Sequence, residues 1–288
     1  MRNAAIIASA LCWAACAPTL PASHPITLPH RLVDGQTGAA LSTAELQARL
    51  AVAELVIVGE EHPNPHHHGA QQELVELALL AQPELALGLE MVAIPKQPVL
   101  DRWFVDGNEA ELLRALDWQH SWGYPFGLYA PTLNVVRRAE RPVYALNALS
   151  SLARQVARQG VASLDEATRA ALPELVPGPP SHRAFFKEAM SHGGHHVDDA
   201  TLERYYTAQL VWDETMAARS AQILRSPSPP RLLVVLAGAG HARRDAVAQR
   251  AQRRGVTKVV TVLPVTEKEL AAALAEHQSD VLWVMRRR

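Results

Sequence analysis

Four histidines fall within seven positions in the stretch LVIVGEEHPNPHHHGAQQ, which spans residues 55–72. An apolar run there ends in a glycine, and Glu60, Glu61 and His62 follow it. Imidazole and carboxylate groups at this density are typical ligands of a metal or a haem iron, and they also serve in acid–base catalysis. The alternative interpretation is a polar loop after a buried strand, so the rest of the chain must decide between them.

Two separate apolar runs end in the pattern Gly-x-x-His, namely GEEH at 59–62 and GAGH at 238–241. A third run, LALGL, leads into Glu90. The carboxyl ends of parallel strands meet at one edge of a sheet, where ligands bind. We therefore expect His62, Glu90 and His241 to form a three-ligand divalent metal site with an open position. A glycine after a strand is also ordinary turn chemistry, but two such histidines beside a strand-end glutamate favour a functional site.

In a hydrolase built on this site, Glu60 and Glu90 would be the catalytic carboxylates, with Glu60 as general base or as a partner that orients a ligand. Asp213 is a further candidate metal ligand, because it shares a predicted helical face with Tyr206 and Gln209. A capping or salt-bridging role is the alternative for Asp213.

A second histidine cluster, SHGGHHVDD, spans residues 191–199. His192, His195 and His196 lie around two glycines in a predicted loop before a helix, where they are candidate ligands for a haem or a metal. A polar surface loop is an equally good interpretation of this pattern.

Aromatic residues are concentrated in DWQHSWGYPFGLYAP, residues 117–131. We expect most of them to pack in the core. A cluster this dense beside a site would also contact a flat, apolar ligand.

The elements that must position these residues alternate along the chain, because apolar runs typical of buried strands are separated by segments with helical periodicity. Such runs predict an α/β fold: a mostly parallel sheet with helices on both faces, plus a smaller helical cap domain. The predicted strands cover residues 54–59, 85–91, 142–148, 258–265 and 281–286, and residues 231–241 are predicted as a strand that runs into a turn.

The same patterns predict a division of the chain. More purely helical composition at residues 97–141 and 150–224 indicates a cap beside the sheet. The α/β domain is then formed by residues 31–96, 142–149 and 225–288.

Residues 1–15 are typical of a secretory signal peptide, because Arg2 precedes an apolar run too short to span a membrane. The following WAAC resembles a bacterial lipobox, which predicts lipidation of Cys16 and an exported, periplasm-facing or outer-membrane lipoprotein. Cleavage after Ala17 is the alternative. The proline-rich residues 16–30 would form a tether.

Charge and cysteine usage exclude several classes of protein. A formal net charge of −1 gives no electrostatic basis for nucleic-acid binding. Cys12 and Cys16 are the only cysteines, and neither would remain as a free thiol in the mature fold. We therefore expect no disulfide, no thiolate zinc site and no iron–sulfur cluster.

An ordered series of segments resembles the ChaN family of haem-binding, iron-regulated lipoproteins, in a superfamily with the Tiki, TraB and erythromycin-esterase-like proteins. The resemblance covers roughly residues 31–265. Its segments, in order, are LVDGQTGAALSTAELQARLAVAELVIVGEEHPNPHHHGAQ, LGLEM, QPVLDRWFVDG, WGYPFGLYAPTLNVVRRAERPVYALNA, AQLVWDETMAARSAQIL and VVLAGAGHAR.

The resemblance implies a parallel α/β domain with a smaller helical domain, and a site built from Glu60, His62, His68, Glu90 and His241. It also implies haem binding between two subunits of a homodimer. A role in haem or iron acquisition at the outer membrane follows, with a TonB-dependent haem receptor as partner.

For the haem itself, the resemblance points to Tyr129 as a candidate iron ligand, with His62 and His68 as further candidates. Tyrosinate and imidazole both ligate ferric haem iron.

Two functions compete on this basis. The first is a lipoprotein that captures haem, favoured by the N-terminal signal, the aromatic cluster and the family resemblance. The second is a metal-dependent hydrolase, in which the two Gly-x-x-His motifs and Glu90 hold a metal that activates water. A non-haem metal-binding role of the histidine loops is a third interpretation.

Overall fold

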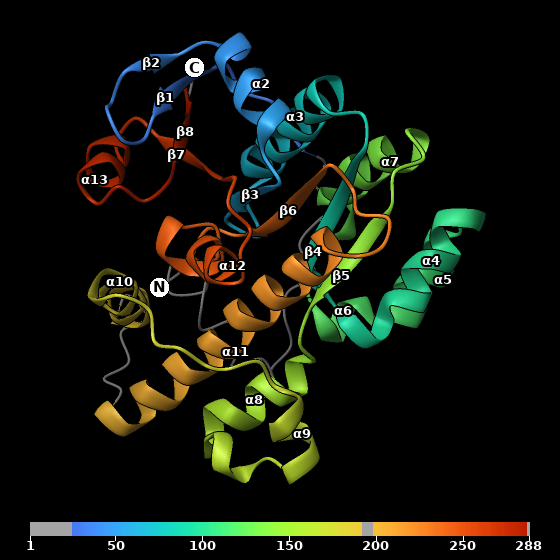
Figure 1. Cartoon of the computed structure of the whole chain (residues 1–288), viewed down its shortest axis with the longest axis vertical. Coiled ribbons are helices and arrows are strands. Elements are labelled where there is room, and N and C mark those ends of the chain that lie inside the picture. Colours follow the sequence, from blue (N-terminus) through green and yellow to red (C-terminus); the bar gives the residue numbers. More distant parts are fainter. Residues whose placement is uncertain (1–24, 192–197, 287–288) are drawn as a thin grey trace.

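The computed structural model describes residues 25–191 and 198–286 of the chain. Within them, eight strands form one sheet in the spatial order β2-β1-β8-β7-β3-β6-β4-β5 (Figure 1). The six strands from β8 through β7, β3, β6 and β4 to β5 run parallel. Strand β1 pairs antiparallel with β8 and with β2, which lies at the edge of the sheet. The predicted α/β class with a mostly parallel sheet is confirmed. The strands are β1 (His30–Asp34), β2 (Ala40–Leu41), β3 (Leu55–Glu60), β4 (Leu85–Ala93), β5 (Val143–Asn147), β6 (Leu232–Gly238), β7 (Val259–Thr266) and β8 (Val281–Met285).

Helices occupy most of the connections between strands. In chain order they are α2 (Thr43–Val52), α3 (Pro65–Ala81), α4 (Gln97–Asp106), α5 (Glu109–Leu116), α6 (Trp118–Ser121), α7 (Ala130–Arg138), α8 (Ser150–Gln159), α9 (Glu166–Ala171), α10 (Pro180–Ser191), α11 (Asp199–Leu224), α12 (Gln249–Arg253) and α13 (Leu270–Ala275). Short 3-10 helices lie at Ile94–Lys96, Phe126–Leu128 and Val161–Ser163, and a π-helical turn lies at Arg244–Ala248.

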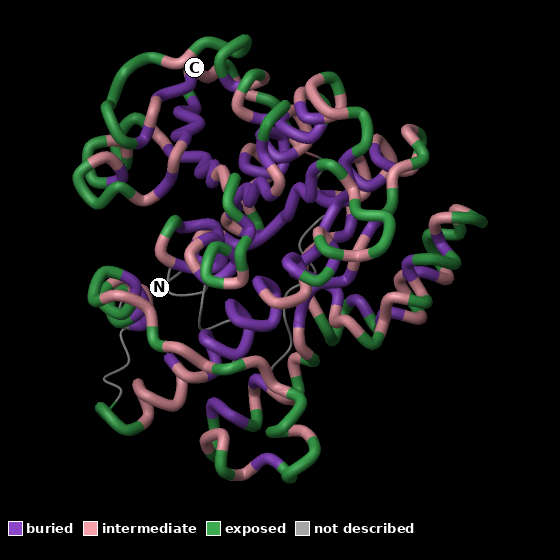
Figure 2. Tube along the Cα trace, in the orientation of Figure 1, coloured by how far each residue is buried: buried purple, intermediate pink, exposed green. Residues whose placement is uncertain are grey.

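Strand β3 shows why the central strands are apolar at nearly every position. Leu55 and Ile57 pack into one core cluster, and Val56 and Val58 pack into another. Because successive side chains of a strand point to opposite faces, a strand covered on both faces needs an unbroken apolar run. The whole of β3 is buried, within the purple centre of Figure 2.

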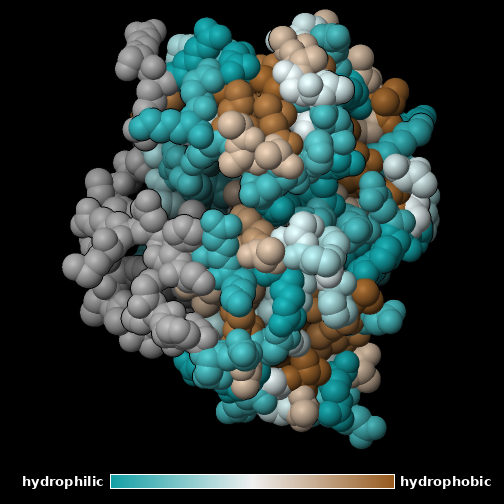
Figure 3. All heavy atoms as spheres, turned by 90° about the vertical axis from the view of Figure 1, so that its left-hand side faces the viewer, coloured by the Kyte–Doolittle hydropathy of each residue, from teal (hydrophilic) through white to brown (hydrophobic). Residues whose placement is uncertain are grey.

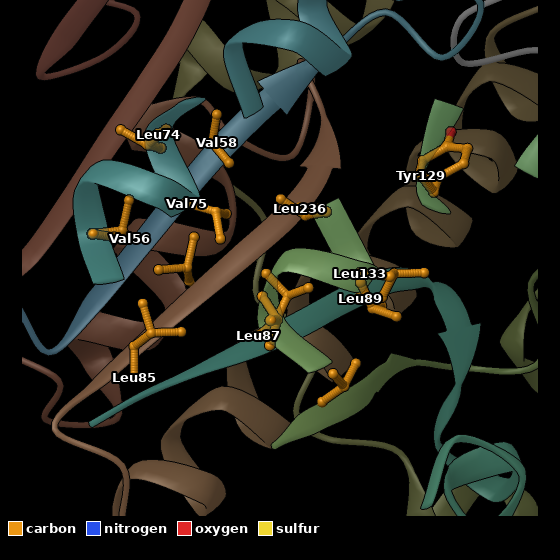
Figure 4. Packing of buried hydrophobic residues seen from close by; sticks show 14 of the residues in the cluster. Val56, Val58, Leu74, Val75, Leu85, Leu87, Leu89, Tyr129, Leu133 and Leu236 are labelled. Carbon is orange, nitrogen blue, oxygen red and sulfur yellow. The ribbon is translucent and has the colours of Figure 1, made fainter. Parts of the chain in front are cut away.

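Helices from different parts of the chain cover the two faces of the sheet. Helix α3 and the helices between residues 97 and 138 share one core cluster with β3, β4 and β6, seen close up in Figure 4. Helices α8, α11 and α12 share the other cluster. The helical segments 97–141 and 150–224 thus contribute to opposite faces. Their assignment to a separate cap domain stays a prediction.

The antiparallel strands β1 and β2 are a difference from the sequence-based prediction, in which the first strand begins at residue 54. Leu32 of β1 pairs with Trp283 of β8. The preceding residues also contact the fold, because the backbone N–H of Ile26 donates to the carbonyl of Pro65 at 2.9 Å. Gly69 permits this contact, since a Cβ atom there would lie 2.4 Å from the Ile26 carbonyl oxygen.

The opposite edge strand, β5, is closed by a side chain. The amide of Gln97 donates to the carbonyl of Val143 at 2.9 Å and accepts from the backbone N–H of Ala145 at 2.7 Å. This amide takes the place of a neighbouring strand and leaves fewer free backbone groups for pairing with another chain.

Large apolar residues at the surface come from separate elements. They are Ile26, Val52, Leu80, Val105 and Leu149. On the face seen in Figure 3, apolar side chains form small groups among larger hydrophilic areas. Across residues 25–191 and 198–286, no helix has the length and hydropathy needed to span a bilayer.

Several sequence-based predictions fall outside the described residues. They are the signal peptide at residues 1–15, Cys16 with the tether up to residue 24, and His192, His195 and His196.

Candidate functional site

Three neighbouring strands bring both Gly-x-x-His motifs and Glu90 to one edge of the sheet. Strand β6 lies between β3 and β4, and Glu60 at the end of β3 pairs with Gly238 at the end of β6. Strand β4 pairs with β6 up to Leu89, and its register with β5 shifts beyond that residue. Glu90 therefore leaves the regular ladder at the level where the other two strands end.

Glu60 is the centre of a first group of buried side chains. Its Oε1 lies 2.8 Å from Nδ1 of His62 and accepts a hydrogen bond from the Tyr129 hydroxyl at 2.9 Å. Its Oε2 lies 2.9 Å from Nδ1 of His68. Burial alone would raise the pKa of Glu60, but the charge of His68 and the hydrogen bond from His62 outweigh burial and lower the pKa to about 2. Glu60 is therefore an anion at neutral pH and can only accept hydrogen bonds.

Helix α3 supplies His68 to this group. Asn64 caps the helix by accepting from the N–H of His66 at 3.1 Å, and Pro65 occupies the first helical position. Nε2 of His68 lies 3.0 Å from the carbonyl of His62. Burial would lower the pKa of His68, yet the charge of Glu60 outweighs it and the pKa is raised. The neighbouring charge of Glu60 therefore favours the protonated ring of His68.

His62 lies against the aromatic residues of the 117–131 segment. Its ring centroid is 4.7 Å from that of Trp122 and 4.9 Å from that of Tyr124. On the β6 side, a Cβ atom at Gly238 would lie 2.9 Å from Cε1 of His62. The glycine of the second Gly-x-x-His motif therefore leaves room for the histidine of the first.

His241 is held between two carboxylates. Its Nδ1 lies 2.6 Å from Oδ1 of Asp213, and its Nε2 lies 3.3 Å from Oε1 of Glu90. Burial alone would lower the pKa of His241, but the charges of Glu90 and Asp213 raise it to about 10. Glu90 also accepts the backbone N–H of Gly238 at 2.6 Å. The charge of His241 lowers the pKa of Glu90 against the effect of burial.

Asp213 of α11 is buried and has further partners. Its Oδ2 lies 3.1 Å from Nε2 of His182 and 3.7 Å from Nη1 of Arg250. Nδ1 of His182 in turn lies 3.0 Å from the Tyr206 hydroxyl. His182 and Arg250 were not among the predicted site residues, because neither stands in a local pattern. They reach Asp213 only because α10 and the segment around α12 pack against α11.

The residues of the predicted three-ligand metal site have their own partners in the structure. Both ring nitrogens of His241 face carboxylates, and an imidazolium has no lone pair to offer a metal. In the part of the chain that the structure describes, no group of three or more His, Cys, Asp or Glu residues is arranged to hold a metal ion. Metal binding by His62, Glu90, His241 and Asp213 stays a prediction that requires these side chains to regroup.

The aromatic segment divides into core and edge. Trp118 and Phe126 are buried, as expected for most of the segment, whereas Trp122 and Tyr124 are half-buried beside His62. An apolar aromatic surface therefore borders the strand-end edge.

Tyr129 is buried at the rim of the core. In Figure 4 its hydroxyl points away from Leu89 and Leu133. This hydroxyl donates to Glu60 and accepts from Nε1 of Trp122 at 2.8 Å. Burial, together with the charge of Glu60, raises the pKa of Tyr129 well above its ordinary value. The environment thus disfavours the tyrosinate that would ligate iron, and the ligand role stays a prediction.

Comparison with solved structures shows the fold. The chain is similar to the structure titled "Cofacial heme binding to ChaN of Campylobacter jejuni", with 19% identity, a TM-score of 0.69, and coverage of 90% of this chain and 97% of that chain. The type III effector HopBA1 matches with 13% identity and a TM-score of 0.48, over 91% of this chain and 98% of that chain. A variant of the erythromycin esterase EreC, in its open conformation, matches with 14% identity and a TM-score of 0.48, over 83% of this chain and 77% of that chain.

Comparison of the sequence gives the family. No protein with a curated function matches it at a significant level. A family model described as "Haem-binding uptake, Tiki superfamily, ChaN" matches residues 46–251, which include β3, β4, β6 and both Gly-x-x-His motifs. The chain therefore belongs to the ChaN family of haem-binding uptake proteins, within the Tiki superfamily.

Proposed function

We propose that this chain binds haem at the strand-end edge and acts in haem or iron acquisition. The observation that carries the proposal is the family match over residues 46–251, joined to an aromatic surface beside His62. The solved ChaN of Campylobacter jejuni is described as binding haem cofacially, which supports a flat porphyrin as the ligand class.

The residues at this edge fit parts of a haem group. Trp122 and Tyr124 are half-buried aromatic side chains, suited to contact with a porphyrin plane. His62 beside them supplies an imidazole. Tyr129 fits less well as a ligand, because its hydroxyl is already shared between Glu60 and Trp122. When bound, the haem would supply a ferric iron with one or two axial positions for protein ligands.

This function can be tested by titrating the mature, exported protein with haem. Saturable binding with a shifted Soret band is expected, and Trp122→Leu or Tyr124→Leu should weaken it. Tyr144→Leu is the matched control, since Tyr144 is a half-buried aromatic residue packed against the core cluster that contains Ile57. Absence of saturable binding by the wild type would overturn the proposal.

We extend the proposal to the cellular setting. The lipobox-like WAAC supports an exported lipoprotein anchored to a membrane through Cys16. Intact mass and membrane fractionation of wild type and Cys16→Ser test this, and a soluble, unmodified wild type would contradict it.

A second copy of this chain, in a homodimer, and a TonB-dependent haem receptor are the proposed protein partners. Sedimentation with and without haem, and co-purification of the receptor, test them.

The second candidate function is hydrolysis, favoured by the contact between Glu60 and His62. A carboxylate 2.8 Å from Nδ1 orients the ring, as in a general-base pair. A panel of carboxylic esters, assayed with added divalent metals and with a chelator, would reveal such an activity. Turnover that disappears in His62→Ala supports it, and no turnover under any condition removes it.

A further inference from the structure

The first described residues lie along helix α3. The backbone N–H of Ile26 donates to the carbonyl of Pro65 at 2.9 Å, at the start of the helix. Two turns further on, Nε2 of His30 lies 3.7 Å from Oε1 of Glu73. Residues 25–29, which we call the N-terminal strap, therefore run in the same direction as α3 before β1 begins.

Gly69 of α3 provides the space in which the N-terminal strap lies. A Cβ atom at Gly69 would be 2.4 Å from the carbonyl oxygen of Ile26 and 3.0 Å from the backbone nitrogen of Thr27. The Ile26 carbonyl also lies 3.4 Å from Nδ1 of His66, one turn earlier in the helix. Leu28 packs against the core cluster. Any side chain at position 69 would thus push the strap away from the helix.

The strap enters the fold at the same edge of the sheet as the candidate site. The carbonyl of Pro29 accepts the backbone N–H of Arg286 at 2.8 Å, and His30 pairs with Met285 at the end of β8. Because β1 is antiparallel to β8, β1 begins where the parallel strands end. Helix α3 also begins there, five residues after β3 ends at Glu60.

We infer that the N-terminal strap turns the strand-end edge toward the lipid bilayer that holds Cys16. This inference rests on the proposed anchoring through Cys16 and goes beyond it by assigning the face that meets the membrane. Nine residues lead from Cys16 to Pro25, and a chain of that length spans at most about 30 Å. A folded unit of this size is roughly 45 Å across. The opposite edge therefore cannot point at the bilayer while the strap lies on α3.

The contacts of the strap are what make the tether short enough to set the orientation. Without them, the free chain would extend from Cys16 to His30, where β1 begins. Those 14 residues reach roughly 50 Å, which is about the width of the folded unit. Either edge can face the bilayer on a tether of that length. The space at Gly69 thus decides which face meets the membrane.

This orientation has a consequence for the proposed site. The strand-end edge carries Trp122 and Tyr124, which are half-buried beside His62. In the anchored protein this aromatic surface faces the lipid bilayer. A flat, apolar ligand held there would enter and leave on the membrane side of the protein.

Energy transfer from a dye on the anchored protein to an acceptor lipid tests the orientation, in vesicles of phosphatidylethanolamine and phosphatidylglycerol. His120→Cys places the dye near the strand-end edge, two residues before Trp122, and Glu84→Cys places it directly before β4, at the opposite edge. The two native side chains are 83% and 68% exposed. The introduced cysteine is the only free thiol, because Cys12 leaves with the signal peptide and Cys16 carries the lipid. Transfer should be at least about twofold stronger from His120→Cys, because strands roughly 20 Å long separate the two edges.

Releasing the strap or lengthening the tether should remove this difference. Gly69→Val pushes the strap off α3. A Gly-Ser insertion of about 20 residues before Pro25 leaves the strap in place but extends the reach of the tether to roughly 100 Å. Gln72→Val is the matched control, because it also places valine in α3, where the Gln72 amide contacts Glu76 of the same helix. The control should keep the difference. If circular dichroism shows that Gly69→Val is unfolded, the insertion replaces it.

The outcomes separate the orientation from the functions proposed above. Equal transfer from the two dyes on the anchored protein, or stronger transfer from Glu84→Cys, overturns the orientation and leaves anchoring and haem binding standing. A difference that persists in Gly69→Val and in the insertion also overturns it, because another surface would then hold this edge at the membrane. A wild type without lipid at Cys16 overturns the anchoring and the orientation with it, whereas haem binding is decided by its own titration.

Discussion

The hydroxyl of Tyr129 lies 2.9 Å from Oε1 of Glu60, although 69 residues separate the two in the chain. The same Oε1 faces His62, so the tyrosine and the histidine share one carboxylate oxygen. Tyr129 therefore contributes to the site by holding Glu60 in place, and the carboxylate in turn orients His62. This relationship assigns different consequences to the loss of each residue.

Replacing Tyr129 with Phe should destabilise the fold, because its hydroxyl joins Trp122 to Glu60. The variant leaves Nε1 of Trp122 without its acceptor and removes one hydrogen bond to Glu60. A cost of about 1–3 kcal/mol in the free energy of unfolding is expected, measurable by urea denaturation. A ferric haem spectrum that loses tyrosinate character in this variant would show that Tyr129 is the ligand after all.

Replacing Gly238 with Ala should weaken haem binding by displacing His62. The added Cβ atom would lie 2.9 Å from Cε1 of that ring and 3.4 Å from its Nε2. Gly59→Ala is the matched control, because it alters the other Gly-x-x-His motif and meets a side-chain carbon of Leu263 at 2.5 Å instead. Both variants should lose stability, but only Gly238→Ala should alter the Soret band. Equal spectra for the two would contradict the contact between Gly238 and His62.

Stability should decline in mildly alkaline solution as His241 loses its proton. The pKa of His241 is raised to about 10 in the fold, from an unfolded value of about 6.5. Its contribution is therefore complete below pH ~6.5 and is lost as the pH rises through about 10. Urea unfolding from pH 6 to pH 11 should show this fall in the wild type and a flatter profile in His241→Gln. Parallel profiles would mean that His241 titrates near its ordinary pKa.

Replacing Arg250 with Met should be strongly destabilising. Arg250 is buried, with Nε 3.3 Å from Oε1 of Glu214 and Nη1 3.7 Å from Asp213. Removing one member of a buried ionic group leaves the remaining charges uncompensated, at a cost of about 3–5 kcal/mol. The control is Arg114→Met, which breaks the exposed pair with Glu111 and should change the unfolding free energy little. A similar decrease in the free energy of unfolding in both variants would show that burial does not make the ion pairs of Arg250 more important for stability than an exposed pair.

Local patterns in the sequence were enough to predict much of the fold. The apolar runs at β3, β4, β5, β6, β7 and β8 identify the parallel strands, because a strand whose two faces are covered by helices is apolar at nearly every position. The antiparallel strands β1 and β2 lack such a signal, since β1 depends on pairing with β8 near the other end of the chain and β2 pairs with β1. The two helical segments were found, but their positions on opposite faces depend on packing that no local pattern records.

For the site, the sequence by itself determined which histidines and carboxylates are present and that they lie at the carboxyl ends of the parallel strands. Parallel strands that end in Gly-x-x-His and in Glu90 must present these groups on one side of a sheet. Only the tertiary structure decided which groups pair. His62 and His241 stand in the same motif, yet His62 meets one carboxylate and His241 meets two. The difference arises because α11 brings Asp213 to His241, and no comparable helix brings a second carboxylate to His62 within the described chain. Hydrogen bonds and charge pairs act over a few ångströms in space, so residues far apart in sequence set the protonation state of each histidine.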